Sequence, residues 1–307
     1  MPIKTLGNLL IKIFIMVLFG FFLKKKKVIN EDFQKKLSGL LINAILPISI
    51  LTSANSEYSK ELSNKLLQSA GIAAGYYIVA IVIMGILCKH ILLGEKKKSI
   101  FKTMSVFANT AFIGFPIVGE LYGPEGTLYT VIYNLFYQLF LFTYGIKLLS
   151  GQDKFEWKSL YKDVSTMVSV LAIFIFISPF RFPGVIVSTL GDIGNMMVPL
   201  SMIIIGCGLA DLNIMDLLND KFSFLVSALR LLIFPTILLV ILKMLQIDTV
   251  LAASCVLITA LPAGSLNVVL AEQYDCEPKF AAQTVIQSMV FMVITLPIII
   301  LLINQVL

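Results

Sequence analysis

The chain consists mostly of apolar runs of about 20 residues separated by short polar stretches, and this alternation limits the folds open to it. A run of that length spans the hydrocarbon core of a bilayer as an α-helix, which satisfies its own backbone hydrogen bonds in lipid. The runs are continuous rather than strictly alternating, which argues against a transmembrane β-barrel. Only 14% of the residues are charged, against about 25% in a soluble domain, so the chain cannot cover a surface exposed to water.

The apolar runs predict ten membrane spans in 307 residues, which leaves no room for a separate soluble domain. The longest polar stretches, residues 53–67 and 150–162, have the size of loops. The predicted spans cover residues 5–23, 36–53, 68–93, 101–121, 126–149, 163–180, 189–209, 222–245, 249–273 and 279–303.

Lysines gather in every second loop, and this pattern predicts the orientation. They lie in residues 24–36, 89–102 and 147–162, whereas the intervening loops hold few basic residues. Loops rich in lysine stay in the cytoplasm, so both termini are expected to be extracytoplasmic in a multi-pass protein of the plasma membrane. Topology therefore accounts for the net charge of +6, and no nucleic-acid partner is predicted.

A weak internal repeat has a constant offset of 152 residues. Asn43 and Pro47 recur as Asn195 and Pro199 (195 − 43 = 152; 199 − 47 = 152), and the pattern E-L-Y beginning at Glu120 recurs as E-Q-Y 152 residues later. One coincidence is expected in an apolar chain, but several identities in one register indicate duplication.

The repeat divides the chain into two copies of five spans, residues 1–149 and 163–307, joined by a cytoplasmic loop over residues 150–162. An odd number of spans forces the second copy to enter the membrane in the opposite orientation, as in many secondary transporters. The predicted fold is therefore an all-α polytopic membrane protein of ten transmembrane helices in two inverted five-helix repeats.

The fourth and ninth predicted spans are interrupted at corresponding places. Proline removes a backbone donor, glycine permits unwinding, and paired interruptions at membrane depth indicate a binding site near the midplane. The free N–H groups of half-helices suit a carboxylate or another small anion, although two simple proline kinks would give the same sequence pattern. The predicted substrate-binding residues are Asn109, Thr110, Gly114, Pro116, Pro262, Gly264, Ser265 and Asn267.

Other polar residues within the spans are expected either to line this site or to form hydrogen bonds between helices. Arg230 is the most unusual of them, and it is expected to bind backbone carbonyls, to face the substrate or to extend to the membrane interface. The full set is Asn43, Asn134, Gln138, Asn195, Arg230, Gln283 and Gln287.

No enzymatic chemistry is predicted. The single histidine, His90, lies among lysines in a loop, and the four cysteines are scattered without metal-ligand spacing. No HExxH motif, carboxylate pair, or Ser/His or Cys/His arrangement is found at membrane depth, so a polytopic membrane enzyme is disfavoured and no cofactor or metal is predicted. No acidic residue falls in the two interruptions, which disfavours a proton antiporter with paired carboxylates. The coupling ion stays open, because sodium can bind to unwound backbone carbonyls.

Four short motifs occur in an order that resembles the auxin efflux carrier family, in particular its compact bacterial permeases. They are N-x-x-x-P from Asn43, A-N-T at 108–110, R-L-L-I-F-P at 230–235 and A-E-Q-Y at 271–274. The resemblance implies that the fourth and ninth spans cross near the midplane. It also implies a scaffold of spans 1, 2, 6 and 7 and a mobile unit of spans 3–5 and 8–10 that moves as an elevator.

The resemblance also implies a transporter whose Asn109 contacts the substrate carboxylate. Residue 108 is alanine where plant members carry proline, so the chain departs from the plant pattern. The resemblance to the bacterial permeases implies a small carboxylate such as malate or malonate as cargo, with an auxin-like acid left open. The implied partners are the lipid bilayer and this substrate, and a homodimer is left open. The alternative is a sodium-coupled symporter of the bile-acid type with the same fold.

Overall fold

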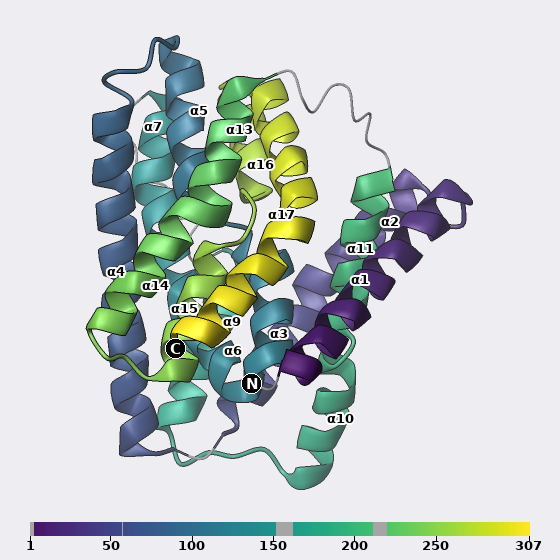
Figure 1. Cartoon of the computed structure of the whole chain (residues 1–307). Coiled ribbons are helices and arrows are strands. Elements are labelled where there is room, and N and C mark those ends of the chain that lie inside the picture. The colour runs from purple at the N-terminus through teal and green to yellow at the C-terminus, as the bar shows by residue number, and fades with distance from the viewer. Residues whose placement is uncertain (1–2, 57, 152–161, 211–219) are drawn as a thin grey trace.

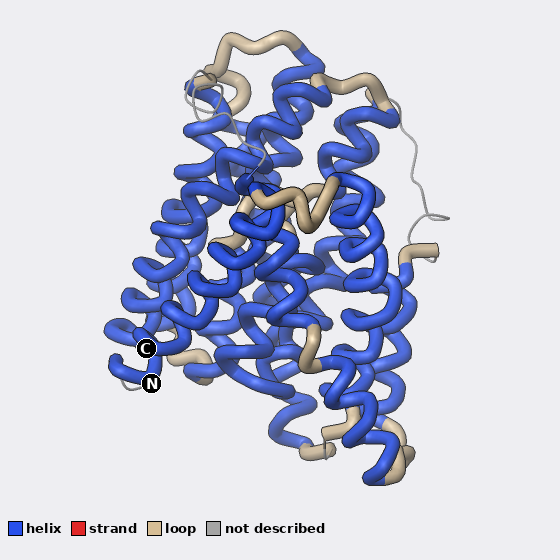
Figure 2. The backbone as a smooth tube through the Cα atoms, turned by 90° about the vertical axis from the view of Figure 1, so that its right-hand side faces the viewer, coloured by secondary structure: helices blue, strands red, loops and turns tan. Residues whose placement is uncertain are grey.

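The computed structural model describes residues 3–56, 58–151, 162–210 and 220–307. Its regular structure in these ranges is helical, apart from one isolated β-bridge (Figures 1 and 2). The first half holds α1 Ile3–Lys25, α2 Glu31–Leu40, η1 Leu41–Ile45, α3 Leu46–Ala54, α4 Lys60–Leu87, α5 Glu95–Val106, η2 Thr110–Gly114, α6 Phe115–Phe140, η3 Leu141–Gly145 and α7 Ile146–Ser150. The second half holds α9 Val164–Ile177, α10 Gly184–Gly194, α11 Met197–Ala210, α13 Lys221–Ala228, η4 Leu229–Ile233, α14 Phe234–Met244, α15 Thr249–Thr259, α16 Leu266–Gln273 and α17 Pro278–Val306. The four η segments are single π-helical turns.

Five of the described helical stretches are long and apolar enough to cross a membrane. They are Glu31–Ala54, Lys60–Leu87, Gly184–Ala210, Lys221–Met244 and Pro278–Val306, and α9 and α15 are shorter apolar helices. The prediction of a polytopic helical membrane protein is thereby confirmed. The finer division into ten spans in two inverted copies stays a prediction, and most of the predicted connecting loop 150–162 lies outside the described residues.

Polar side chains set where several helices begin. Ser59 accepts a hydrogen bond from the Leu62 N–H at 3.0 Å and starts α4, and Asp163 accepts from the Thr166 N–H at 2.8 Å and starts α9. The prediction of a loop over residues 53–67 is therefore wrong for its second half. The capped first turn of α4 is polar because it extends the helix beyond the apolar run.

The helices pack as two groups. The frame group comprises α1, α2, α3, α9, α10 and α11, in which α1 runs along α11 and α3 packs on α9 and α10. The crossover group comprises α4–α7 and α13–α17, in which α6 packs on α4 and α15, and α13 packs on α17. Figure 1 shows α1, α2, α10 and α11 to the right and most of the crossover group to the left. The groups meet mainly where α6 contacts α3, α9 and α11.

Two glycines bring α1 and α11 into backbone contact. A Cβ atom added at Gly206 would lie 2.0 Å from the Val17 carbonyl oxygen, and one at Gly20 would lie 2.2 Å from the Ile203 carbonyl oxygen. A side chain at either position therefore requires the two helices to separate. Small residues at such crossings are typical of helices that pack within a membrane.

Candidate functional site

The break between α5 and α6 lies at residues 107–109. Helix α5 ends at Val106, Phe107 is extended with φ −101° and ψ 114°, and Asn109 has φ −86° and ψ 70° before η2 begins. Gly114 and Pro116 were expected inside the break, but the structure places them after it, in η2 and the first turn of α6. Proline is tolerated there because the first turn of a helix has no partner for its N–H.

The second break, between α15 and α16, covers residues 260–265 and crosses the first. Ala108 and Ala263 form an antiparallel bridge, in which the Asn109 N–H donates to the Pro262 carbonyl and the Gly264 N–H donates to the Phe107 carbonyl, both at 3.0 Å. The two interrupted segments therefore satisfy part of each other's freed backbone, as a break at membrane depth requires. The Ala263 N–H donates to Ser288 Oγ of α17 at 3.1 Å.

Glycines allow this close approach. A Cβ atom at Gly264 would lie 2.8 Å from the Ala108 carbonyl oxygen, and one at Gly114 would lie 3.0 Å from the Leu261 side chain. Thr110, Gly114 and Pro262 are buried, and Ser265 is half-buried. Gly114 and Gly264, one from each of the two predicted spans, thus lie at one crossing.

Arg230 ties the ends of the two interrupted helices together. Its Nε donates to the Leu261 carbonyl at 2.9 Å and its Nη2 to the Thr259 carbonyl at 3.3 Å, both at the end of α15. Its Nη1 donates to the Ser105 carbonyl at the end of α5, at 3.2 Å. The side chain is fully buried, so it does not reach the interface, and it forms no ion pair with an acidic side chain of the described residues. A positive charge without a counter-charge therefore lies beside the crossing.

Two asparagines at the crossing are closed off from solvent. Asn109 is 4% exposed and Asn267 is 0% exposed. Asn109 Oδ1 accepts from the Phe112 N–H at 3.3 Å, and Asn109 Nδ2 has no hydrogen-bond partner among the described residues. Buried polar atoms are normally paired, so this unpaired donor is unusual and makes Asn109 a candidate for contact with a bound molecule.

Two polar residues of α6 connect the crossing to the frame group. Asn134 Oδ1 accepts from the Thr110 hydroxyl at 2.8 Å, and its Nδ2 donates to Ser165 Oγ of α9 at 2.9 Å. One turn later, Gln138 Nε2 donates to Asp163 Oδ1 at 3.0 Å. These two residues therefore form bonds between helices, and Asn134 reaches the site through Thr110.

The remaining predicted residues lie in different places. Asn43 is exposed in η1, which packs on α2, α3, α9 and α11 of the frame group. Gln283 is half-buried on α17, and Gln287 is buried on the same helix beside Ser288, which binds the second break. Asn195 is exposed and lines a polar cavity of about 350 Å³ between α3, α6, α10 and α11. This cavity lies where the two groups meet.

A comparison of the sequence with protein families identifies the chain. The model of the auxin efflux carrier family, described as membrane transport protein, matches residues 6–158 and 153–300. The chain belongs to this family.

Two relatives of this membrane transport protein are archaeal transporters that match nearly their whole length. An uncharacterized transporter of Methanocaldococcus jannaschii is 22% identical over 290 residues, covering 91% of this chain and 92% of the relative. An uncharacterized transporter of Methanothermobacter thermautotrophicus is 25% identical over 299 residues, covering 94% and 95%. The protein is therefore a membrane transporter and not an enzyme.

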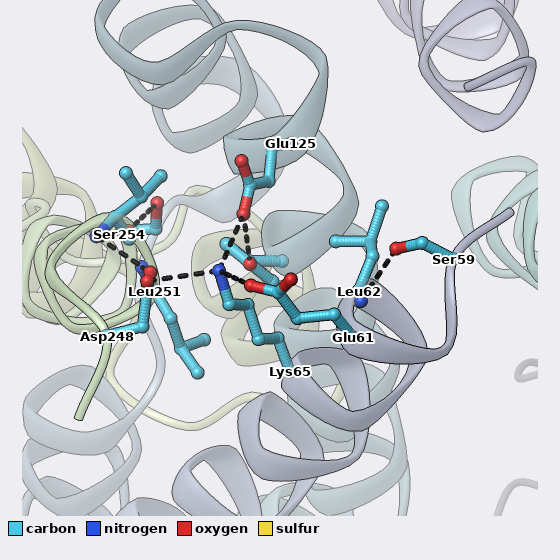
Figure 3. A network of polar contacts seen from close by, with 10 residues as sticks. Ser59, Glu61, Leu62, Lys65, Glu125, Asp248, Leu251 and Ser254 are labelled. Atoms are coloured by element: carbon cyan, nitrogen blue, oxygen red, sulfur yellow. Dashed lines mark hydrogen bonds and ion pairs between the residues drawn. The ribbon is translucent and has the colours of Figure 1, made fainter. Parts of the chain in front are cut away.

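A charged cluster at one end of the transporter joins three helices of its crossover group (Figure 3). Lys65 Nζ of α4 lies 3.1 Å from Glu61, 3.0 Å from Asp248 and 3.8 Å from Glu125 of α6. Asp248 also accepts from the Leu251 N–H at 3.1 Å and thereby begins α15. The cluster fixes α4, α6 and α15 relative to one another. It was not predicted from the sequence, because Lys65 was expected to lie in a loop.

Two further contacts of the transporter were not found from the sequence. Lys12 of α1 forms an ion pair with Glu120 of α6, across the boundary between the two groups. Ser288 supports the second break, as described above. The sequence carries a signal for Ser288, because it follows Gln287 on the polar side of the last span, but nothing in the sequence pairs Lys12 with Glu120.

Proposed function

We propose that this membrane transporter carries a small organic anion, a carboxylate such as malate or malonate, by alternating access of the elevator type. The observation that supports this most directly is the unpaired Asn109 Nδ2 beside the crossing that Arg230 holds. A buried N–H donor next to an uncompensated guanidinium favours an anion over a cation or a neutral solute.

Charge balance supports the same substrate class. A charged side chain in a membrane interior is costly and usually marks a substrate pathway. Arg230 is hydrogen-bonded to carbonyl oxygens, which stabilise the guanidinium but carry no net charge. A bound carboxylate would supply the missing negative charge.

The two packing groups support the elevator mechanism. The frame group corresponds to predicted spans 1, 2, 6 and 7, and the crossover group to spans 3–5 and 8–10, in a fold of ten spans and two inverted repeats. The crossover group contains both interrupted helices, so its movement would carry the site past the frame. The polar cavity between the groups would give access from the side on which the termini lie, which the lysine pattern predicts to be extracytoplasmic.

The sodium-coupled alternative shares this fold and differs in the ion bound with the substrate. Auxin-like acids also remain within the proposed substrate class, as does assembly as a homodimer. A thermal-shift screen of the purified protein against small mono- and dicarboxylates, with and without sodium and at two pH values, separates these cases. A ligand that binds the folded state raises the thermal midpoint by mass action.

The site assignment is tested with Asn109→Ala in proteoliposomes loaded for uptake of labelled malate or malonate. We expect uptake to fall at least 10-fold, because the variant loses the buried donor for the carboxylate, a charge-assisted hydrogen bond of about 1.5–3 kcal/mol. The control is Asn43→Ala, which removes the same side chain from an exposed position of the frame group.

Wild-type uptake by a folded Asn109→Ala protein would refute the assignment of the site. Equal loss in Asn43→Ala would show that the assay reports folding rather than substrate contact. Failure of the wild-type protein to bind or move any small carboxylate would refute the proposed substrate class.

A further inference from the structure

An apolar groove opens on the surface of the crossover group between α4 and α14. Both helices pack on α15, and the space between them has a volume of about 420 Å³. Ala80, Leu238 and Leu242 form its buried floor, and Val79 and Ile241 form its exposed edges. Because both helices belong to stretches that can cross a membrane, the groove faces lipid.

Two glycines of α4 keep the groove open. Gly71 and Gly75 line it one turn apart, and a Cβ atom added at either would meet no heavy atom within 4 Å. Glycines four residues apart usually let a second membrane helix approach closely, yet both of these are exposed. The glycine face therefore has room for a narrow apolar chain.

The groove continues a polar stripe on one face of α4. Glu61, Lys65 and Gln68 follow one another at helical spacing, and Ile72 extends this face into the groove. The end of the face is thus polar and its middle is apolar. From Gln68 to Ile83 the groove follows α4 for about 22 Å, which is more than half of the hydrocarbon core of about 30 Å.

The mouth of the groove lies beside the charged cluster of Figure 3. Gln68 lies one turn after Lys65, and Ile247, on the other side of the mouth, precedes Asp248. Three carboxylates surround the single ammonium of the cluster, so its net charge is −2 when all four groups are ionised (1 − 3 = −2). The Glu61 carboxylate is 79% exposed. The mouth therefore favours a cationic group and repels an anionic one.

We propose that the groove binds one membrane phospholipid with an amine headgroup, of the phosphatidylethanolamine type. An acyl chain lies between α4 and α14, the headgroup ammonium pairs with Glu61, and the Gln68 amide donates to the phosphate. Such a lipid is apolar where the groove is apolar and cationic where its mouth is acidic. This inference goes beyond the proposed function and does not depend on the cargo.

The bound chain would contact a part of the crossover group that adjoins the crossing. Tyr76 and Phe234 line the groove, and their rings lie 6.4 Å apart, edge to face. Phe234 begins α14 one turn after Arg230, and the Tyr76 ring also lies 6.0 Å from that of Tyr133 of α6. The lipid would therefore move with the crossover group and stabilise the packing behind Arg230.

The experiment measures lipid binding to the purified full chain by native mass spectrometry in detergent. The protein is delipidated and then mixed with equal amounts of phosphatidylethanolamine and phosphatidylglycerol that carry the same acyl chains. We expect one phospholipid per chain, with the ethanolamine lipid favoured by about 5-fold, the scale of one partly exposed ion pair.

Filling the groove should displace the acyl chain. Gly75→Leu places a side chain in the groove and should weaken binding of the ethanolamine lipid by about 10-fold or more, because two buried CH₂ groups already account for that much. The control is Gly85→Leu, at which a Cβ atom also meets nothing within 4 Å but which lies on α4 outside the groove. If Gly75→Leu does not fold, Gly71→Leu fills the groove one turn away.

A second pair of variants tests the headgroup. Glu61→Gln removes an exposed carboxylate at the mouth, so the two lipids should bind with nearly equal affinity. The control is Glu31→Gln of α2, because Glu31 is exposed to the same extent and also pairs with a lysine four residues later. This change should preserve the preference for the ethanolamine lipid.

Equal lipid binding by Gly75→Leu and the wild-type protein would overturn the inference. Equal binding of the two lipids by the wild-type protein, or a preference for phosphatidylglycerol, would also overturn it. A dimer that is lost in Gly75→Leu, seen in the same spectra, would show that the groove holds a second copy instead. All these outcomes leave the proposed transport of a small carboxylate intact, since no such acid is present in the experiment.

Discussion

At the residue scale, Arg230 pairs the free carbonyls at the C-terminal ends of both α5 and α15, as a C-terminal cap does for a single helix. The last carbonyls of an α-helix lack partners within the helix, and here those of α5 and α15 end inside the protein. One guanidinium has five N–H donors in a rigid plane, so it can bind carbonyls from both helices at once. Sequence alone left open whether Arg230 bound backbone, faced substrate or extended to the interface.

Two substitutions of Arg230 should separate the effect of its hydrogen bonds on stability from the effect of its charge on anion binding. Arg230→Gln leaves carbonyls unpaired, each at about 1–3 kcal/mol, and removes the charge, so both thermal stability and L-malate binding should fall. Arg230→Lys restores the charge without the planar fork, so stability should fall while much of the anion binding returns. Thermal denaturation and calorimetry on both variants check this.

Arg181→Gln is the matched control, because Arg181 also donates to carbonyls at a helix end, those of Ile175 of α9 and of Ser178, which follows α9, but lies half-buried in the frame group. Its loss should leave L-malate binding unchanged. Equal anion binding by Arg230→Gln and the wild-type protein would show that this charge does not contribute to the site.

At the element scale, the position of α15 depends on both its ends. Arg230 holds its C-terminus at the crossing, and Asp248 caps its N-terminus within the charged cluster of Figure 3. Partial burial raises the pKa of the Asp248 carboxyl, but the Leu251 N–H and the Lys65 ammonium lower it further, so it lies below its ordinary value. The ionised form therefore favours the folded state.

Asp248→Asn tests this end of the helix. Asparagine keeps the cap, so the variant removes chiefly the ion pair with Lys65, worth about 1 kcal/mol for a partly exposed pair. The thermal midpoint at pH 7 should fall by a few degrees. Because the native pKa is lowered, the contribution is present above the unfolded value of about 3.9 and is lost as the pH falls through the native value, so the difference should shrink in acid.

The exposed ion pair of Asp275 with Lys96 is the control for that measurement. The pKa of the Asp275 carboxyl is also lowered, by the hydrogen bond from Lys96. Both side chains are exposed to water, however, so Asp275→Asn should not shift the thermal midpoint measurably. A difference between Asp248→Asn and the wild-type protein that grows below pH 4 would contradict the assigned role of the carboxylate.

The sequence predicted which helices are interrupted, but not the residues at which the first of them breaks. Gly114, Pro116 and Pro262 mark the right segments, because proline and glycine end helices by local chemistry. The first break nevertheless lies at residues 107–109, where an apolar phenylalanine and alanine carry no local signal, and it exists because the other segment pairs with it.

The sequence allowed those parts of the candidate site to be predicted in which a single polar residue stands in an apolar span. Asn109 and Asn267 are polar residues in apolar spans, and both lie at the crossing. Asn43 has the same signal and a repeat partner, yet it is exposed in the frame group. The contacts of Ser288 and Leu261 join residues that are distant in sequence, and only the packed structure shows them.

At the scale of the whole molecule, the polar contacts that join the two groups in the described part of the chain include three side-chain pairs. These are the Lys12–Glu120 ion pair, the bond of Asn134 to Ser165 and that of Gln138 to Asp163. Elevator movement would have to break them in every cycle, whereas the charged cluster around Lys65 would travel intact within the crossover group.

A covalent link between the groups should therefore stop transport without stopping binding. In Lys12→Cys/Glu120→Cys, a short bifunctional maleimide should abolish malate uptake in proteoliposomes and leave calorimetric binding of L-malate in detergent largely unchanged. The natural cysteines Cys88, Cys207, Cys255 and Cys276 are buried, which directs the reagent to the introduced pair.

The matched link is Lys96→Cys/Asp275→Cys, which replaces an ion pair inside the crossover group. Because both positions would move together, uptake should survive this link. Continued uptake by the fully cross-linked Lys12→Cys/Glu120→Cys protein would rule out relative movement of the two groups at this place.

The bridge between Ala108 and Ala263 runs entirely through main-chain atoms, and this has a consequence for how the family can diversify. Substitutions other than proline leave the amide groups that join the two segments in place, provided that Gly264 is kept, because a Cβ atom there would lie 2.8 Å from the Ala108 carbonyl oxygen. The crossing can therefore persist while the residues around it change, and relatives only 22–25% identical to this chain still align with 91–94% of it. A scaffold of this kind can acquire a new cargo through a few substitutions near the crossing, while the crossing itself is retained.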